Sequence, residues 1–152
     1  MAEQKKKVWR TPPWVPGHIE QFTSDPDGAG QWDARQAGVD ATVPALLLIT
    51  RGRRSGEPRP APVIYQKVDA GYCVIASKGG WPDHPAWFLN LQADPVCEIQ
   101  VGRERLRARA RVAEGAERAA LWATMRAAYS AFDDYQARTQ REIPVVVLEP
   151  LR

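Results

Sequence analysis

Nine residues of the chain, Arg51 to Arg59, have the composition of an anion-binding loop. They include four arginines and two glycines and directly follow the apolar run from Ala45 to Thr50. Guanidinium groups match phosphate and carboxylate oxygens in pairs, and glycine lets backbone N–H groups turn toward a ligand. Four neighbouring cations repel one another unless something neutralises them. An exposed turn with solvated arginines is the alternative, and we favour anion binding.

A second stretch, from Ala76 to Gly80, carries a serine, a lysine and two glycines. It offers a hydroxyl, an ammonium group and free backbone donors, which suit a phosphate. On its own the signal is weak, because many hairpins end in two glycines. Both stretches lie at the ends of predicted strands that are near each other in the predicted order, so we expect them to form one anion site.

Aromatic residues suggest where a ring could bind. Trp87 and Asn90 are three residues apart and share a face of a short predicted helix. Tyr129, Phe132 and Tyr135 also recur at spacings of three, which is equally typical of a plain aromatic core. Buried tyrosine hydroxyls need partners, so a cavity with one polar end is the competing interpretation.

Composition limits the other chemistry. The only histidines are His18 and His84, and Cys73 and Cys97 form no metal-binding cluster, so we predict no metal site and two buried free thiols. The net charge of +3 does not indicate nucleic-acid binding. The arginine-rich segment 103–111 is predicted to be a solvated strand face, because no RNA-binding aromatic signature accompanies it. With neither a long apolar run nor a secretory signal, a cytoplasmic location is expected.

The elements that must position these residues are mostly strands. Apolar runs and period-two alternation predict six strands at 45–50, 62–67, 72–77, 96–101, 104–112 and 143–148. In the fifth, Leu106, Ala108, Ala110 and Val112 are expected to face the core. A short helix from Pro85 through Gln92, capped by Asp83 or His84, and a longer amphipathic helix from Ala116 through Phe132 complete the list.

Short connections favour antiparallel pairing. The sequence therefore predicts a mainly β (α+β) fold: a small, partly open, six-stranded split β-barrel with one short helix and a longer C-terminal helical segment.

The first 44 residues are expected to be irregular. They hold five prolines and a run of three lysines at residues 5–7. We place a flexible, basic, proline-rich arm at residues 1–17 and the barrel domain at residues 18–152. The basic arm is either solvated or bound to an anionic membrane surface or a partner, while the tryptophans after it favour packing on the body or on a second subunit.

Three segments of the chain resemble the deazaflavin-dependent nitroreductase family of actinobacteria. They are LLLITRGRRSGEPRPAPVIY, VIASKGGWPDHPAWFLNLQADP and YSAFDDYQARTQREIPVVVLEP, and the resemblance covers residues 18–150. It implies a split-barrel flavin or deazaflavin oxidoreductase, often a homodimer, that binds the reduced deazaflavin coenzyme F420. The phosphate and oligoglutamate tail of that coenzyme would be the anion.

The resemblance also assigns residues. By position, cofactor binding falls to Arg53, Arg54, Ser55, Gly56, Arg59, Pro62, Ala76, Ser77, Lys78, Gly79, Ala86, Trp87 and Asn90. The substrate pocket falls to Tyr129, Phe132 and Tyr135. Two positions depart from the family: Arg51 replaces a small threonine, and Phe132 replaces a tyrosine whose hydroxyl could orient a nitro group.

The mechanism expected from this resemblance is hydride transfer to an electron-poor small molecule such as a quinone or an activated enone. The cofactor carries the chemistry and the protein supplies orientation. Tyr129, Tyr135 or solvent would protonate the product, and Ser77 would hydrogen-bond the substrate. An FMN-dependent split-barrel enzyme, a non-catalytic binder of the deazaflavin or another anion, and a nucleic-acid binder are the alternatives.

Overall fold

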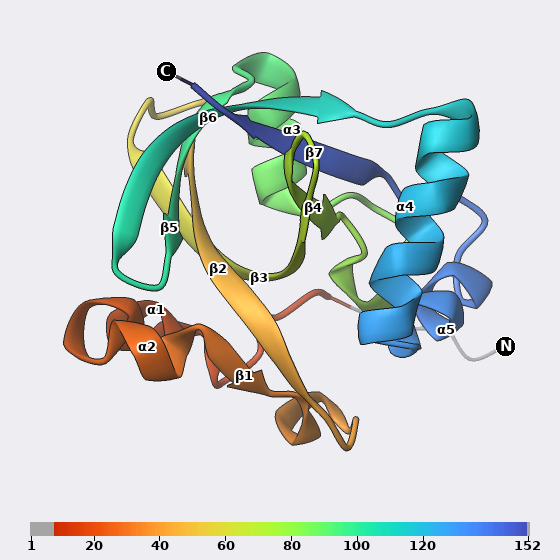
Figure 1. The fold of residues 1–152 in the computed structure, drawn as a ribbon, viewed down its shortest axis with the longest axis horizontal. Helices are drawn as coiled ribbons and strands as arrows, with labels where there is room; N and C mark the ends of the chain where they lie inside the picture. Colours follow the sequence, from red (N-terminus) through yellow and green to blue (C-terminus); the bar gives the residue numbers. More distant parts are fainter. Residues whose placement is uncertain (1–7, 152) are drawn as a thin grey trace, which may run out of the picture.

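The computed structural model describes residues 8–151, which form an antiparallel barrel of six strands (Figure 1). The strands are β2 (Thr42–Arg51), β3 (Pro58–Val68), β4 (Gly71–Ile75), β5 (Val96–Val101), β6 (Glu104–Val112) and β7 (Val145–Pro150). They pair in the order β2-β3-β4-β7-β6-β5, and β2 pairs again with β5 from Leu47 opposite Gln100 to Ile49 opposite Glu98. This last pairing closes the ring. The predicted six-stranded barrel is confirmed.

The barrel has buried side chains on both faces of β7. Val146 and Leu148 belong to the cluster inside the barrel, whereas Val145 and Val147 pack on the outer face with Met125 of α4 (Gly115–Ala128). Successive residues of a strand point to opposite faces. A strand buried on both sides therefore needs the uninterrupted apolar run that the sequence shows here.

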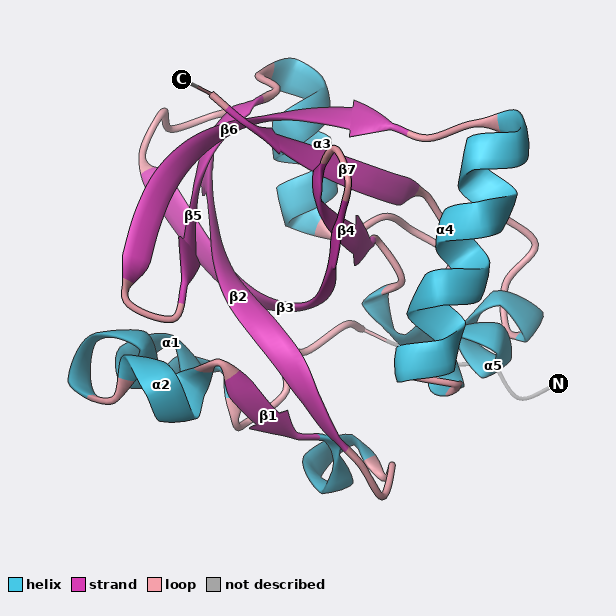
Figure 2. Ribbon diagram, viewed as in Figure 1, coloured by secondary structure: helices cyan, strands magenta, loops and turns pink. Residues whose placement is uncertain are grey.

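Helices cover two regions of the barrel (Figure 2). The short helix α3 (Ala86–Ala93) adds Phe88 and Leu91 to the inner cluster, while α4 and α5 (Ala131–Ala137) lie beside β4 and β7. Helix α3 begins after Pro85, which has extended dihedrals and no side-chain cap, so the predicted cap at Asp83 or His84 is wrong.

Two further predictions about elements are wrong. The amphipathic helix predicted through Phe132 is two helices, because Tyr129 has extended backbone dihedrals (φ −148°, ψ 91°) that end α4. In β6 the burial alternation holds only to Ala110: Val112 is 47% exposed although it still pairs with Val146 of β7, because β6 has there run past β5, whose pairing ends at Val96 opposite Arg109. Ala113 is buried in the outer cluster instead.

The N-terminal region is more ordered than predicted. It contains α1 (Val15–Ser24), α2 (Pro26–Ala29), β1 (Gln31–Asp33) and the 3₁₀ turn η1 (Ala34–Ala37), and β1 pairs with the start of β2. Phe22 is 1% exposed because it packs with Leu47 beneath α1, and Asp25 caps α2. The predicted boundary between residues 17 and 18 lies inside α1, and the three lysines at 5–7 lie outside the described residues.

Other features concern the chemistry that the fold can host. Cys73 and Cys97 are free and buried, as predicted. Across residues 8–151, no group of three or more histidine, cysteine or acidic side chains is arranged to hold a metal ion. Over the same residues, no helix combines the length and apolar character that crossing a membrane requires.

Candidate functional site

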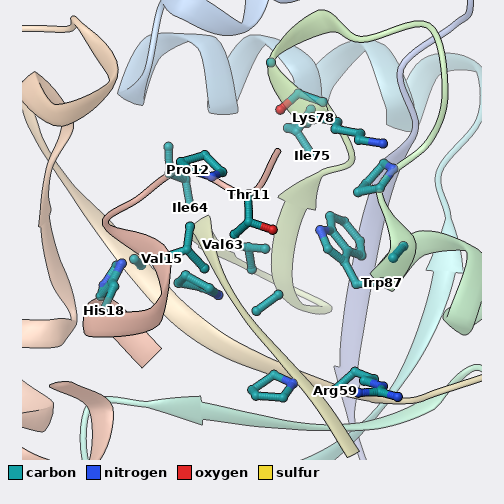
Figure 3. Close-up of a pocket in the computed structure, with 18 of the residues that line it drawn as sticks. Thr11, Pro12, Val15, His18, Arg59, Val63, Ile64, Ile75, Lys78 and Trp87 are labelled. Atoms are coloured by element: carbon teal, nitrogen blue, oxygen red, sulfur yellow. The ribbon is translucent and has the colours of Figure 1, made fainter. Parts of the chain in front are cut away.

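A cavity of about 740 Å³ lies between the β2–β3 loop, α3, α5 and the N-terminal segment. This volume is within the range of about 300–1,000 Å³ that is usual for small-molecule sites. In Figure 3, Lys78, Trp87 and Arg59 lie on one side of the cavity, and Val15 and His18 lie on the other.

Most of the residues predicted for the site line this cavity. From the β2–β3 loop and β3 they are Arg53, Arg54, Ser55, Arg59 and Pro62; from the loop after β4 and from α3 they are Ser77, Lys78, Gly79, Ala86, Trp87 and Asn90. Two predicted residues, Gly56 and Ala76, are not among the lining residues. Ala76 is fully buried and its N–H donates to Pro144 O, so it supports the loop from behind.

The arginine loop is a compact turn between β2 and β3. The N–H of Gly52 donates to Glu57 O at 2.8 Å, and the N–H of Gly56 donates to Gly52 O at 2.8 Å. A Cβ atom on Gly52 would lie 2.7 Å from Ser55 Oγ, closer than real Cβ atoms approach. Arg59 Nη2 donates to the same Ser55 oxygen at 3.3 Å. Only glycine at position 52 therefore allows the backbone to approach Ser55 this closely. The hydrogen bond from Arg59 to Ser55 connects the two sides of the turn.

The positive charge of this loop is not neutralised by the protein. Arg51, Arg53, Arg54 and Arg59 are all exposed, and none of them forms an ion pair with an acid among residues 8–151. Glu57 lies in the same turn without pairing with them. Three of the arginines line the cavity, whereas Arg51 lies outside its lining. Unpaired guanidinium groups at a cavity wall favour an anionic ligand.

Asn90 connects α3 to the arginine loop. Its side chain is buried (3% exposed), and its Oδ1 accepts hydrogen bonds from the backbone N–H of Arg53 at 3.2 Å and from Arg53 Nη1 at 2.9 Å. Its Nδ2 donates to Thr50 Oγ1 at 3.0 Å. The resemblance placed Asn90 against the cofactor ring, and the geometry adds a different role, which is to orient Arg53.

The loop after β4 has an unusual backbone. Lys78 (φ 45°), Gly79 (φ 61°) and Gly80 (φ 83°) are all in the left-handed region, which a residue with a side chain rarely adopts. A Cβ atom on Gly80 would lie 2.5 Å from Tyr135 O, so only glycine fits there. The backbone N–H groups of Lys78 and Gly79, both at the cavity, donate to no acceptor within residues 8–151. Free N–H groups in such a turn are suited to an anion.

Lys78 has two partners. Its Nζ forms an ion pair with Asp83 at 2.8 Å and lies 5.1 Å from the ring centre of Trp9. The hydrogen bond from Lys78 holds the pKa of Asp83 below its usual range. Lys78 is thus fixed at the cavity wall rather than extended into solvent.

Arg141 is a site residue that sequence reasoning missed. Its Nε donates to Trp81 O at 2.8 Å, Nη1 to Ala76 O at 3.2 Å and Nη2 to Ser77 O at 2.8 Å. Its Nη1 also lies 3.2 Å from His84 Nδ1. Burial lowers the pKa of Arg141 somewhat from its ordinary value. All of these partners except the imidazole are backbone carbonyls, which leave no pattern in a sequence.

The part of the cavity wall formed by Tyr129 and α5 is aromatic. The hydroxyls of Tyr129 and Tyr135 lie 2.9 Å apart, and the ring of Phe132 meets that of Tyr129 edge to face at 5.0 Å. Burial raises the pKa of Tyr129, and the hydrogen bond with Tyr135 raises it further. Tyr129 and Phe132 are 2% and 3% exposed, yet all three side chains line the cavity. The aromatic stripe is therefore both core and cavity wall.

The N-terminal segment supplies a further wall, and none of its individual residues was assigned to the site from the sequence. Trp9 packs edge-on against Trp81 at 5.3 Å, and Trp14 lies 6.1 Å from Trp32. His18 Nε2 lies 2.8 Å from Ala29 O. The residues that this segment adds to the cavity are Trp9, Thr11, Pro12, Trp14, Val15, His18 and Trp32. Tryptophans spread among polar residues were the only signal that could have indicated them.

Comparison with known proteins decides the family. The sequence matches the family described as F420H(2)-dependent quinone reductase over residues 31–150. The chain belongs to this family. A relative from Mycobacterium tuberculosis, Rv3178, provisionally named an F420H(2)-dependent quinone reductase, is 42% identical over 75% of this chain and 96% of its own length.

Two solved structures are similar to this chain, which is consistent with its place in the F420H(2)-dependent quinone reductase family. An F420-H2 dependent reductase, FDR-A, is 38% identical with a TM-score of 0.64 and covers 69% of this chain and 93% of its own. A structure described as a domain-swapped dimer is 34% identical with a TM-score of 0.67 and covers 86% and 95%. The resemblance found in the sequence is confirmed: the protein is an oxidoreductase that uses F420H2 and acts on quinones.

The residues of the cavity fit this cofactor of the quinone reductase family. F420 carries a phosphate and a chain of glutamates, and the cavity offers three arginines without an ion pair among residues 8–151 and two free backbone N–H groups. The apolar and aromatic part of the lining suits a planar ring and an uncharged substrate.

Proposed function

We propose that the protein binds F420H2 by its anionic tail at the two loops and reduces a quinone held against the aromatic wall of the same cavity. The observation that carries this proposal is the combination of side chains that line the cavity. Arginines that form no ion pair among residues 8–151 and a set of aromatic side chains border one continuous space. A cofactor with a charged tail and a flat ring needs both.

In this proposal the arginine loop and the loop after β4 hold the phosphate and glutamates. Arg53, Arg54 and Arg59 would donate paired hydrogen bonds, and the N–H groups of Lys78 and Gly79 would add two more. Bound there, F420H2 supplies the hydride. Trp87 and the start of α3 at Ala86 would lie along the ring and keep water from it, since both line the cavity.

The tyrosine pair would control the proton. Reduction of a quinone to a hydroquinone takes up a hydride and one proton. The hydroxyl of Tyr129 is protonated at neutral pH, as that of an ordinary tyrosine is, and can donate to the substrate oxygen, while burial raises its pKa and keeps it a weak acid. Tyr135 is only half-buried and touches Tyr129 at 2.9 Å, so it connects that hydroxyl with solvent. Ser77 at the cavity is a further donor to the substrate.

Cofactor titration and turnover test the proposal together. Purified protein is titrated with F420 and with FMN by fluorescence, and oxidation of F420H2 is followed with benzoquinones, naphthoquinones and an activated enone. We expect saturable binding of F420 and faster oxidation with quinones than without protein. Saturable binding of FMN but not F420 would assign the flavin-dependent alternative. F420 binding without turnover on any acceptor would leave a carrier.

Tyr129→Phe then separates chemistry from binding. It removes one hydroxyl and keeps the ring that packs on Phe132. We expect turnover with quinones to fall by about 10-fold or more while F420 affinity is retained, as for loss of one positioned acid. Unchanged turnover would mean that solvent supplies the proton directly.

Nucleic-acid binding through residues 103–111 is not supported by their contacts. Arg103 pairs with Asp27, and Arg111 pairs with both Glu117 and Glu149. Arg105 Nη1 lies 4.0 Å from Glu98 Oε2, so only Arg107 and Arg109 of this segment form no ion pair among residues 8–151, and two cations are few for a nucleic-acid backbone.

Two statements about assembly also belong to the proposal. A homodimer is supported by the related domain-swapped dimer, and light scattering of the purified protein tests it. Peripheral membrane association through the basic residues 5–7 rests on charge alone. Sedimentation with anionic vesicles, and its loss when the three lysines are replaced by glutamine, tests it.

A further inference from the structure

We infer that Arg141 is a positioning residue for the anion site: it holds the loop from Ala76 to Trp81 in the conformation that presents Lys78 and two free N–H groups to the cavity. Arg141 lies outside the lining of the cavity and so acts through the loop. The inference rests on the proposed binding of the cofactor tail at this loop.

The first argument concerns the hydrogen-bond partners of the carbonyl oxygens in the loop. Arg141 collects the carbonyl oxygens of Ala76, Ser77 and Trp81 with three different nitrogens, at 3.2, 2.8 and 2.8 Å. Lys78 O accepts from the N–H of Trp81 at 3.1 Å. A carbonyl oxygen repels an anion, so a loop that binds one must direct its carbonyls elsewhere. The guanidinium group of Arg141 donates to three of these carbonyl oxygens from behind the loop, so they point away from the anion.

The second argument is strain. Three successive left-handed residues, one of them Lys78, are costly and persist only where the surroundings fix them. Inside the loop, two hydrogen bonds act on this stretch: Gly80 N–H to Ser77 O at 2.9 Å and Trp81 N–H to Lys78 O at 3.1 Å. Arg141 binds the loop at both ends, before and after the left-handed residues. Its planar fork spans a gap that a single ammonium group cannot.

The third argument is charge. Arg141 is half-buried, and none of the carboxylates among residues 8–151 forms an ion pair with it. Its nearest side-chain partner is the uncharged Nδ1 of His84. A guanidinium held by carbonyls rather than by an acid keeps its full positive charge, which adds attraction for an anion on the other side of the loop.

Arg141→Lys and Arg141→Gln test the inference, with Arg118→Gln as the control. Like Arg141, Arg118 is half-buried, lies outside the cavity lining and donates to a backbone carbonyl, Ile143 O at 2.8 Å, but its hydrogen bonds within residues 8–151 do not reach the loop from Ala76 to Trp81. Thermal melting first establishes that each variant is folded. The ligands are F420 and the same deazaflavin stripped of its phosphate and glutamates.

Both Arg141 variants are expected to bind F420 about 10- to 100-fold more weakly, because the fraction of molecules with a competent loop falls by that factor. Affinity for the stripped deazaflavin should stay the same, KM for F420H2 should rise, and kcat at saturation should be retained. Arg118→Gln should change none of these. Equal loss for both ligands, or no loss for F420, would overturn the positioning role.

Amide hydrogen exchange reads the loop without any cofactor. In the Arg141 variants the amides of Gly80 and Trp81 should exchange faster, because the turn that protects them is no longer held, while the Arg118 variant should match the unaltered protein. Unchanged exchange at both amides would overturn the inference by itself. Failure of the unaltered protein to bind F420 would instead overturn the proposed function.

Discussion

Replacing Asn90 with alanine tests how the barrel orients the arginine loop. The amide makes three hydrogen bonds, two from Arg53 and one to Thr50. The exposed Arg53 guanidinium can exchange its bond for water, so the cost comes from the Arg53 backbone N–H and from Thr50, which is 1% exposed. An unsatisfied buried group costs about 1–3 kcal/mol, and because Arg53 is an exposed residue whose N–H can partly regain water, the pair should cost about 2–3 kcal/mol, the low end of the sum.

That loss has a measurable size. A domain of this length loses roughly 2–4 °C in Tm per kcal/mol, so Asn90→Ala should melt about 4–12 °C lower. Affinity for F420 should fall about 10-fold, the equivalent of one charge-assisted hydrogen bond from a guanidinium that is no longer oriented. Gln92→Ala is the control, because Gln92 is an exposed residue of the same helix.

A double-mutant cycle with Arg53→Ala identifies the route of the effect on binding. If Asn90 acts through Arg53, then Asn90→Ala should weaken F420 binding little further once Arg53 is removed. Fully additive losses would refute the reasoning and favour direct contact between Asn90 and the ring, as would an equal loss of affinity for a deazaflavin without its tail.

Three further predictions concern the loop, pH and thiols. Gly80→Ala should lower Tm by several degrees in a thermal melt and weaken F420 binding, because its Cβ would meet Tyr135 O at 2.5 Å. Burial, followed by the charge of Arg141, lowers the pKa of His84, so the unfolded chain binds a proton at a pH where the native protein does not. Denaturant titrations should show the free energy of unfolding falling as pH drops below about 6.5 and levelling off once His84 of the native protein is also protonated. This slope should be absent in His84→Gln. Burial raises the pKa of Cys73 to about 12, so a thiol reagent should label it only at the rate of unfolding; prompt labelling of native protein would contradict its burial.

The barrel was predictable from sequence because its strands follow simple patterns. The run from Val145 to Leu148 is apolar throughout since both faces are covered, and residues 104–110 alternate since one face is wet. The helix around His18 was not predictable in this way. Its sequence, VPGHIEQFTS, contains a proline and a glycine, and its position depends on Phe22 packing against distant Leu47. Tertiary contacts of this kind outweigh weak local propensity.

The residues of the site also divide into those that the sequence predicts and those that it does not. The arginine loop and Ser77–Gly79 were found because anion binding demands a local composition that short stretches of sequence display. Ala76 is not among the residues that line the cavity, because its side chain packs in the barrel cluster, a direction that its position next to Ser77 does not reveal. Arg141 was missed because its partners are main-chain atoms some sixty residues away.

The walls of the cavity are also built differently, and this bears on how its specificities can vary. The β2–β3 loop and the loop after β4 are held by hydrogen bonds with Asn90 and Arg141. The N-terminal segment meets the barrel loops largely through aromatic contacts, such as that of Trp9 with Trp81. Aromatic packing tolerates changes of size and angle better than a hydrogen-bonded loop does. The ring of Trp9 also lies against Lys78, so its substitution should disturb the anion site, whereas substitutions at Thr11, Pro12 and Val15 can reshape the space for a quinone while the hydrogen bonds of the two loops stay intact.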